Sequence, residues 1–122
     1  MLGQNILVVD DESNIVQSLA FVFNREGFDA AKTGDGVQSM SMIRDSKPNL
    51  LSLDIMMPNK NGYEVCQEIK SDPELQDIQA VMLSSISNEE SRRHAMSQGS
   101  DDYINKPFNP MQVVTRVKEL LA

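Results

Sequence analysis

The sequence lacks several features that would each point to a particular class of protein. It contains no Trp and a single cysteine, Cys66, which excludes an internal disulfide and fits a reducing compartment. No apolar run approaches the roughly 18 residues that a membrane helix needs. Residues 1–5 show no basic stretch followed by an apolar block, so we expect no signal peptide. These absences predict a cytoplasmic protein with no membrane contact.

Basic residues are also scarce. The chain has 11 Lys and Arg against 18 Asp and Glu, which gives a formal net charge of −7. An acidic protein of this kind repels the phosphate backbone of a nucleic acid, so we expect no direct nucleic-acid binding. Hydrophobic residues make up 40% of the 122 positions. This length and composition predict one domain, residues 1–122, with a single core.

Short apolar runs alternate with segments of helical periodicity along the whole chain. We expect strands at 6–9, 28–31, 50–54, 80–83 and 103–105. Between and after them we expect five helices: the first is capped by Ser13 or Asn14 and stops at Gly27, and the others span 37–43, 65–69, 87–99 and 110–121. The proposed caps of the second, fourth and fifth helices are Asp35 with Gln38, Ser87 with Glu90, and Asn109 followed by Pro110.

Strands that alternate with helices over short connections predict an α/β fold with a parallel sheet covered on both faces. Right-handed crossovers then give a doubly wound, five-stranded parallel sheet with five helices. We expect the flavodoxin-like strand order 2-1-3-4-5.

Polar side chains stand where four of the five predicted strands end. They are Asp10 and Asp11, Asp54, Ser84 and Lys106. Because the carboxyl ends of parallel strands share one edge of a sheet, we expect these side chains to converge. Carboxylates held close together repel one another, and a hard cation such as Mg²⁺ relieves that repulsion.

This set of groups suits phosphoryl transfer. Lys106 and Ser84 can each bind a phosphoryl oxygen, and Asp54 is the candidate nucleophile, because carboxylates form aspartyl phosphates. Neither a histidine-containing catalytic dyad nor a Gly-rich phosphate loop competes for this role.

At these residues the chain resembles the response-regulator receiver domains of two-component signal transduction, over about residues 5–121. The resemblance rests on Val8–Glu12, Leu53–Pro58 with Gly62, Leu83–Ser85 and Gly99–Phe108, in that order. It implies a cytoplasmic phosphoprotein that acts as a signalling switch. It is not an enzyme in the ordinary sense, although such a domain assists its own phosphorylation and dephosphorylation.

The resemblance assigns a role to each position. Asp54 would receive the phosphoryl group from a histidine kinase or a histidine phosphotransfer protein. Mg²⁺ would be held by Asp10, Asp11, Asp54 and the Met56 carbonyl, with Asp11 the more direct ligand of the first two. Lys106 would contact the phosphoryl group.

Ser84 and Tyr103 stand at the family's two switch positions, although a structural hydroxyl and an ordinary strand aromatic are plainer interpretations. Phosphorylation would shift the face formed by the fourth helix, fifth strand and fifth helix toward a downstream protein or output domain. A phosphorylation-dependent homodimer is also compatible with the resemblance.

The sequence departs from the family pattern at three points, and two other functions are alternatives to the receiver interpretation. Met56 and Ile86 are apolar at positions that influence loss of the phosphoryl group in the family, which implies slow self-dephosphorylation, and Ser52 needs a hydrogen-bond partner if it is buried. Asn61 replaces a common Asp. A small Asp-nucleophile phosphatase would need a second acid at position 56, where this chain has Met56. A flavin-binding domain would need a Ser-, Thr- and Gly-rich loop after the first strand, where this chain has Asp10–Glu12.

Overall fold

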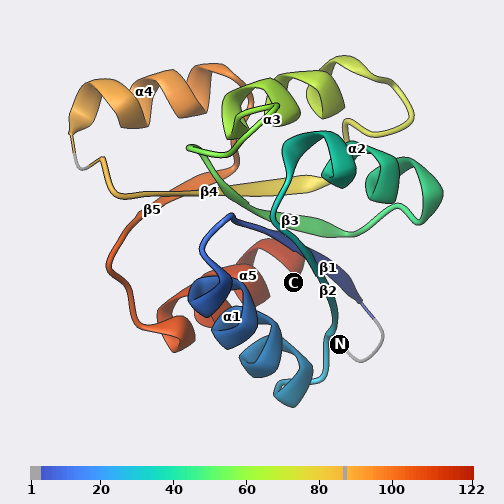
Figure 1. Cartoon of the computed structure of the whole chain (residues 1–122), viewed down its shortest axis with the longest axis vertical. Helices are drawn as coiled ribbons and strands as arrows, with labels where there is room; N and C mark the ends of the chain where they lie inside the picture. The colour runs from blue at the N-terminus through green and yellow to red at the C-terminus, as the bar shows by residue number, and fades with distance from the viewer. Residues whose placement is uncertain (1–3, 87) are drawn as a thin grey trace.

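Five parallel strands form the central sheet, in the order β2-β1-β3-β4-β5 (Figure 1). The computed structural model describes residues 4–86 and 88–122. The strands are β1 (Asn5–Val9), β2 (Asp29–Thr33), β3 (Leu50–Asp54), β4 (Gln79–Ser84) and β5 (Asp102–Asn105). The helices are α1 (Ser13–Arg25), α2 (Gly36–Asp45), α3 (Gly62–Ser71), α4 (Glu89–Ser97) and α5 (Pro110–Leu121). The predicted fold class and strand order are confirmed.

Helices cover both faces of the sheet, as Figure 1 shows: α1 and α5 lie on one side, and α2, α3 and α4 lie on the other. Alternate residues of the inner strands therefore enter two separate cores. Val8, Leu50 and Val81 pack with α1 and α5, whereas Leu51, Leu53 and Met82 pack with α2 and α3. Burial on both faces explains why the central strands are almost continuously apolar.

The edge strand β2 differs from its prediction. It runs from Asp29 to Thr33, whereas the sequence predicted a strand at 28–31. Parallel pairing with β1, from Asn5 opposite Asp29 to Val9 opposite Thr33, extends the strand. Tertiary pairing here overrides local turn preference.

Several helix starts also differ. Neither Ser13 nor Asn14 caps α1, because Glu12 takes the cap position and makes no side-chain capping bond. Asp35 caps α2, but Gln38 accepts a hydrogen bond from the Thr33 hydroxyl instead of completing a capping box. A complete box is present at α3, where Asn61 pairs with Glu64. Asn61, where an Asp is common in the family, therefore serves as the cap of α3.

The remaining caps involve α4 and α5. The expected capping residue Ser87 lies outside the described residues, and the Asn88 side chain accepts the hydrogen bond from the Ser91 N–H. Asn109 caps α5, with Pro110 in the first turn, as predicted. None of the described helices is long and apolar enough to cross a membrane.

Candidate functional site

Asp54 is the last residue of β3, the central and most deeply buried strand. Only 4% of its surface is exposed. The next residue, Ile55, still donates its N–H to the Leu83 carbonyl of β4 at 3.3 Å. The sheet therefore fixes the position of the Asp54 backbone up to the point where the strand ends.

Gly62 keeps the following loop close to Asp54. The Gly62 N–H donates to the Ile55 carbonyl at 2.8 Å. A Cβ atom at Gly62 would lie 2.3 Å from the Asp54 carbonyl oxygen, well inside contact distance. Glycine at this position lets α3 begin directly against the end of β3.

The loop after β1 supplies two more carboxylates. Asp10 is buried, donates its N–H to the Thr33 carbonyl at 3.1 Å, and accepts the Glu12 N–H on Oδ1 at 2.9 Å. Asp11 is exposed. Asp10, Asp11 and Asp54 each present a carboxylate oxygen within 4.8 Å of the others. The predicted convergence of these three acids is found in the structure.

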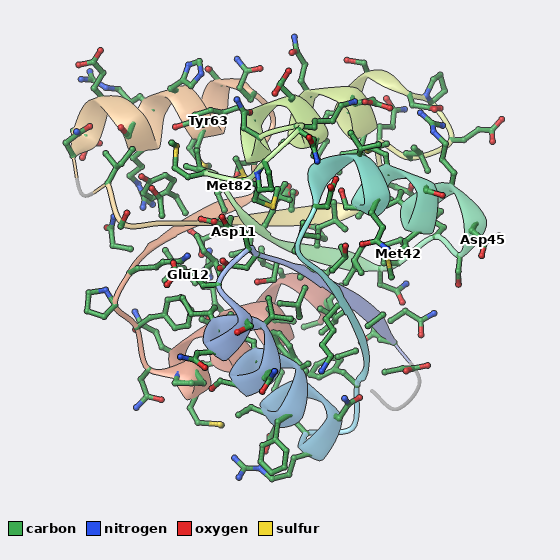
Figure 2. All side chains as sticks on the ribbon, in the orientation of Figure 1. Asp11, Glu12, Met42, Asp45, Tyr63 and Met82 are labelled. Atoms are coloured by element: carbon green, nitrogen blue, oxygen red, sulfur yellow. The ribbon has the colours of Figure 1, made fainter. Side chains whose placement is uncertain are left out.

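Figure 2 shows where this cluster lies. Asp11 and Glu12 follow the end of β1 above α1, well away from Asp45 at the far end of α2. A hollow of about 240 Å³, lined in part by Asp10 and Asp11, opens beside them to solvent. The acidic cluster is thus reachable from outside at the carboxyl end of the sheet.

Lys106 places its ammonium group inside the cluster. Its Nζ lies 2.9 Å from Asp10 Oδ2, 3.0 Å from Glu12 Oε1 and 3.3 Å from Asp54 Oδ1. Its side chain is 9% exposed, and its backbone N–H donates to the Ser84 carbonyl at 2.7 Å. The hydrogen bond from its backbone fixes Lys106 against β4. The lysine, which follows β5, therefore places its positive charge at the end of β3.

Glu12 is a member of this site that sequence reasoning did not single out. It directly follows the two predicted acids, and its carboxylate reaches Lys106 although the side chain is largely exposed. Its position next to Asp10 and Asp11 is the one sequence feature that could have indicated that Glu12 belongs to the site. The distance to Lys106, 94 residues away in sequence, depends on the tertiary fold.

The carboxylates and the lysine alter one another's ionisation. Burial raises the pKa of Asp54 to about 6, and the negative charge of Asp10 adds to this rise, against the attraction of Lys106. Burial by itself lowers the pKa of Lys106, but the carboxylates of Asp10, Glu12 and Asp54 outweigh it and raise that pKa above its ordinary value. Lys106 is therefore charged, whereas Asp54 holds its negative charge at a cost.

Lys106 alone does not satisfy the negative charge. Among the described residues, Asp10 Oδ2 is buried and has no partner with hydrogen-bond geometry, although Nζ lies near it. The atoms that could ligate a metal here are carboxylate oxygens, and those of Asp10 and Asp54 are buried. That donor set fits a hard divalent cation such as Mg²⁺ rather than a thiolate- or imidazole-seeking metal.

The predicted switch residues lie around the loop between β4 and α4. Ser84 is buried at the end of β4, and its Oγ accepts the Ile86 N–H at 3.0 Å. The Tyr103 hydroxyl donates to the Ile86 carbonyl at 2.6 Å, and Asn105 donates to the same oxygen at 3.0 Å. Tyr103 is itself buried. Ile86 thus joins Ser84 to β5, and Asn105 is a contact that the sequence did not reveal.

Two further predicted positions lie two residues after Asp54 and two residues after Ser84. Met56 extends into solvent with 65% of its surface exposed, and Ile86 is 37% exposed. Neither side chain offers a polar atom that could orient a water molecule.

Ser52 departs from expectation. It is fully buried within β3, and among the described residues its hydroxyl has no hydrogen-bond partner. The expected partner is therefore not found, and β3 tolerates an unpaired hydroxyl beneath Asp54.

The doubly wound fold thus brings together a buried acid at the end of its central strand, two acids beside it and a lysine from the end of β5. The family model for the response regulator receiver domain matches residues 6–118, and the chain belongs to that family. It is therefore a signal-transduction domain of two-component systems and not a classical enzyme. The phosphatase and flavin-binding alternatives find no support.

Similar proteins agree with this assignment. The chain is 39% identical over 120 residues to the DNA-binding response regulator MtrA of Mycobacterium tuberculosis, covering 98% of this chain and 51% of MtrA. It is 36% identical over 121 residues to the phosphate regulon regulator PhoB of Pseudomonas aeruginosa, covering 99% of this chain and 53% of PhoB. The chain thus spans about half the length of these regulators.

Solved structures show the same fold. A putative response regulator from Chloroflexus aurantiacus superposes with a TM-score of 0.92 at 26% identity, covering 98% of both chains. A BeF3-activated DrrB receiver domain superposes with a TM-score of 0.89 at 30% identity, covering 99% of this chain and 98% of that chain.

Proposed function

We propose that residues 1–122 form one receiver domain in which Asp54 accepts a phosphoryl group from a histidine kinase or a histidine phosphotransfer protein. The observation that carries this proposal is the distance of 3.3 Å between Lys106 Nζ and the buried Asp54 carboxylate, beside two further acids. Asp10, Asp11, Asp54 and the Met56 carbonyl would hold Mg²⁺, which would neutralise charge on the transferring group.

The transfer itself uses groups of this chain. An Asp54 carboxylate oxygen attacks phosphorus, the bond from phosphorus to the donor histidine nitrogen breaks, and that nitrogen keeps the electron pair. As the phosphoryl group arrives, the Lys106 ammonium keeps part of its contact with Asp54 and also contacts a phosphoryl oxygen. Because its ammonium is already held by three carboxylates, little reorganisation is needed.

The experiment is incubation with acetyl phosphate and Mg²⁺, followed by intact mass measurement. We expect one added phosphoryl group that hydroxylamine removes. It should be absent in EDTA and absent in Asp54→Asn. Modification that persists in Asp54→Asn would contradict the assignment of Asp54 as the acceptor.

The contacts of Ile86 suggest how the switch is transmitted. If the Ser84 hydroxyl turns to a phosphoryl oxygen, it releases the Ile86 N–H, and the Tyr103 hydroxyl is bonded to the carbonyl of that same residue. Arg92 of α4 donates to the Tyr103 carbonyl at 3.1 Å, so β5 is also coupled to α4. The Lys106→Ala variant should still bind Mg²⁺ but should fail to produce this rearrangement.

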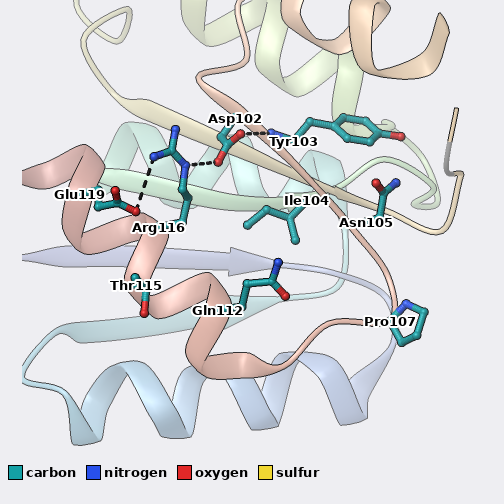
Figure 3. Close-up of a pocket in the computed structure, with 9 residues that line it drawn as sticks. All are labelled: Asp102, Tyr103, Ile104, Asn105, Pro107, Gln112, Thr115, Arg116 and Glu119. Atoms are coloured by element: carbon teal, nitrogen blue, oxygen red, sulfur yellow. Dashed lines mark hydrogen bonds and ion pairs between the residues drawn. The ribbon is translucent and has the colours of Figure 1, made fainter. Parts of the chain in front are cut away.

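The face formed by α4, β5 and α5 would present the result to a downstream protein, an output domain or a second copy of the chain. A groove of about 650 Å³ lies on this face, lined by β5 and α5. Figure 3 shows the Asp102–Arg116 ion pair between these two elements. Arg92 lies 3.9 Å from Asp102, and Lys118 pairs with Glu26 at 2.7 Å, while both basic side chains stay about half exposed. The groove adjoins Tyr103, which links it to Ser84 through Ile86.

The lifetime of the phosphoryl group should be long. The exposed side chains of Met56, two residues after Asp54, and Ile86, two residues after Ser84, are apolar and cannot orient an attacking water. Self-dephosphorylation should therefore be slow, and a half-life of seconds in the isolated phosphorylated protein would contradict this expectation. We place the domain in the cytoplasm, where the single free thiol of Cys66 would remain reduced.

A further inference from the structure

The loop between β3 and α3, residues 55–61, contains Met56 and lies against the start of α2. Its tip is sharply turned: the Lys60 N–H donates to the Pro58 carbonyl at 2.7 Å, and Asn59 between them has a φ of 69°. Asparagine is one of the few non-glycine residues that tolerate this left-handed conformation.

Asn59 bonds to the cap of the neighbouring helix. Its Nδ2 donates to Asp35 Oδ2 at 2.6 Å, while Asp35 Oδ1 accepts the N–H groups of Val37 and Gln38 at 2.7 and 3.1 Å. Both carboxylate oxygens of Asp35 are therefore engaged. The Gln38 N–H and then the Asn59 amide lower the pKa of Asp35, which keeps its carboxylate ionised.

The backbones of the loop and the helix are in direct contact next to this bond. A Cβ atom at Gly36 would lie 1.9 Å from the Lys60 carbonyl oxygen, so no side chain fits between them. The Lys60 ammonium pairs with Glu68 of α3, and Glu68 also pairs with Arg44 of α2. The loop tip is therefore attached to α2 directly and again through α3.

We propose that Asp35 and Asn59 form a latch that positions the β3–α3 loop so that the Met56 carbonyl can contribute to Mg²⁺ binding. This inference rests on the proposed function. Met56 lies three residues before Asn59 in the same short loop, and its side chain is mostly exposed and provides little anchoring. A loop that is already fixed before the ion binds loses less conformational freedom when its carbonyl becomes a ligand, and binding is therefore stronger. Asp35 and Asn59 are positioning residues and do not touch the ion.

The test measures Mg²⁺ binding directly, by isothermal titration calorimetry on the unphosphorylated protein. Asn59→Gly removes the amide, tolerates the same φ and leaves the net charge unchanged. We expect roughly three- to tenfold weaker Mg²⁺ binding in this variant, the effect of losing one hydrogen bond. Affinity equal to that of the unaltered protein would overturn the latch.

A second variant exchanges the two partners. In Asp35→Asn/Asn59→Asp the new amide at 35 can still cap α2 with its oxygen and can donate to the new carboxylate at 59, at constant net charge. We expect Mg²⁺ affinity within about twofold of the unaltered protein, because one good hydrogen bond replaces another. An exchange variant as weak as Asn59→Gly would also overturn the proposal.

Asn24→Gly serves as the matched control. The Asn24 side chain accepts the Ala30 N–H at 3.0 Å near the end of α1, away from the acidic cluster. This variant should lower the thermal midpoint in EDTA and leave Mg²⁺ affinity unchanged, which separates positioning from general destabilisation. If the unaltered protein binds no Mg²⁺, the proposed function fails; if it binds and Asn59→Gly binds equally well, only the latch fails.

Discussion

The raised pKa of Asp54 predicts that its ionised carboxylate destabilises the fold at neutral pH. Replacing Asp54 by Asn keeps the size and removes the charge. The pKa rises from 3.8 to about 6, chiefly through burial and the negative charge of Asp10, and this shift already includes the attraction of Lys106. About two pKa units at 1.36 kcal/mol each correspond to roughly 3 kcal/mol.

The sign of the pH dependence follows from proton linkage. Between pH 3.8 and about 6 the folded protein keeps a proton on Asp54 that the unfolded chain releases. The contribution of this proton to the free energy of unfolding is fully present below pH 3.8, the pKa in the unfolded chain, and is lost as the pH rises through about 6, the pKa in the folded protein. Asp54→Asn should therefore match the unaltered protein near pH 4 and exceed its stability by up to about 3 kcal/mol at pH 7.5.

Urea unfolding in EDTA, followed by circular dichroism at several pH values, measures this difference. A gain that is absent, or equally large at pH 4.5 and 7.5, would refute the reasoning. Asp77→Asn is the control: a hydrogen bond from Lys47 lowers the pKa of Asp77, so the carboxylate is ionised in both states above pH 3.8 and the effect of this variant should hardly change between pH 4.5 and 7.5. Mg²⁺ should reduce the advantage of Asp54→Asn, since the cation compensates the buried charge.

Three further predictions concern the surroundings of Asp54. Ser52→Ala should raise stability by about 1 kcal/mol in urea unfolding, because the buried hydroxyl is unpaired, and a loss would show that it has a partner. Lys106→Met should cost about 3 kcal/mol at pH 7, partly recovered by Mg²⁺, because it leaves buried carboxylates without their cation; no loss would contradict the ion-pair geometry. Gly62→Ala should cost at least about 2 kcal/mol and slow phosphorylation, since its Cβ would lie 2.3 Å from the Asp54 carbonyl. Gly34→Ala, with 3.4 Å available, should be tolerated in the same assays, and equal losses in the two variants would contradict this.

The convergence of Asp10, Asp11, Asp54 and Lys106 was predictable because each follows a buried apolar run. Parallel strands place such positions at one edge whatever the details of packing. Phe28–Ala31 was too weakly patterned to reveal where β2 ends, since an edge strand is only half-covered. Its pairing with β1 decided that end.

Contacts between segments distant in sequence could not be predicted. Glu12 reaches Lys106, and Asn59 reaches Asp35, through side-chain distances that local pattern does not encode. The same holds for the unpaired hydroxyl of Ser52, because only the packed strand shows whether a partner is within reach.

The sequence alone determined the order of strands and helices, and with it the group of residues that meet at the carboxyl end of the sheet, because hydrophobic periodicity and chain connectivity are local properties. The tertiary structure alone decided how those groups interact: the pKa of Asp54, the three ion pairs of Lys106 and the attachment of the β3–α3 loop to α2. Electrostatic and hydrogen-bond energies depend on distances of a few ångströms and on burial, and both are set only when the whole chain has packed.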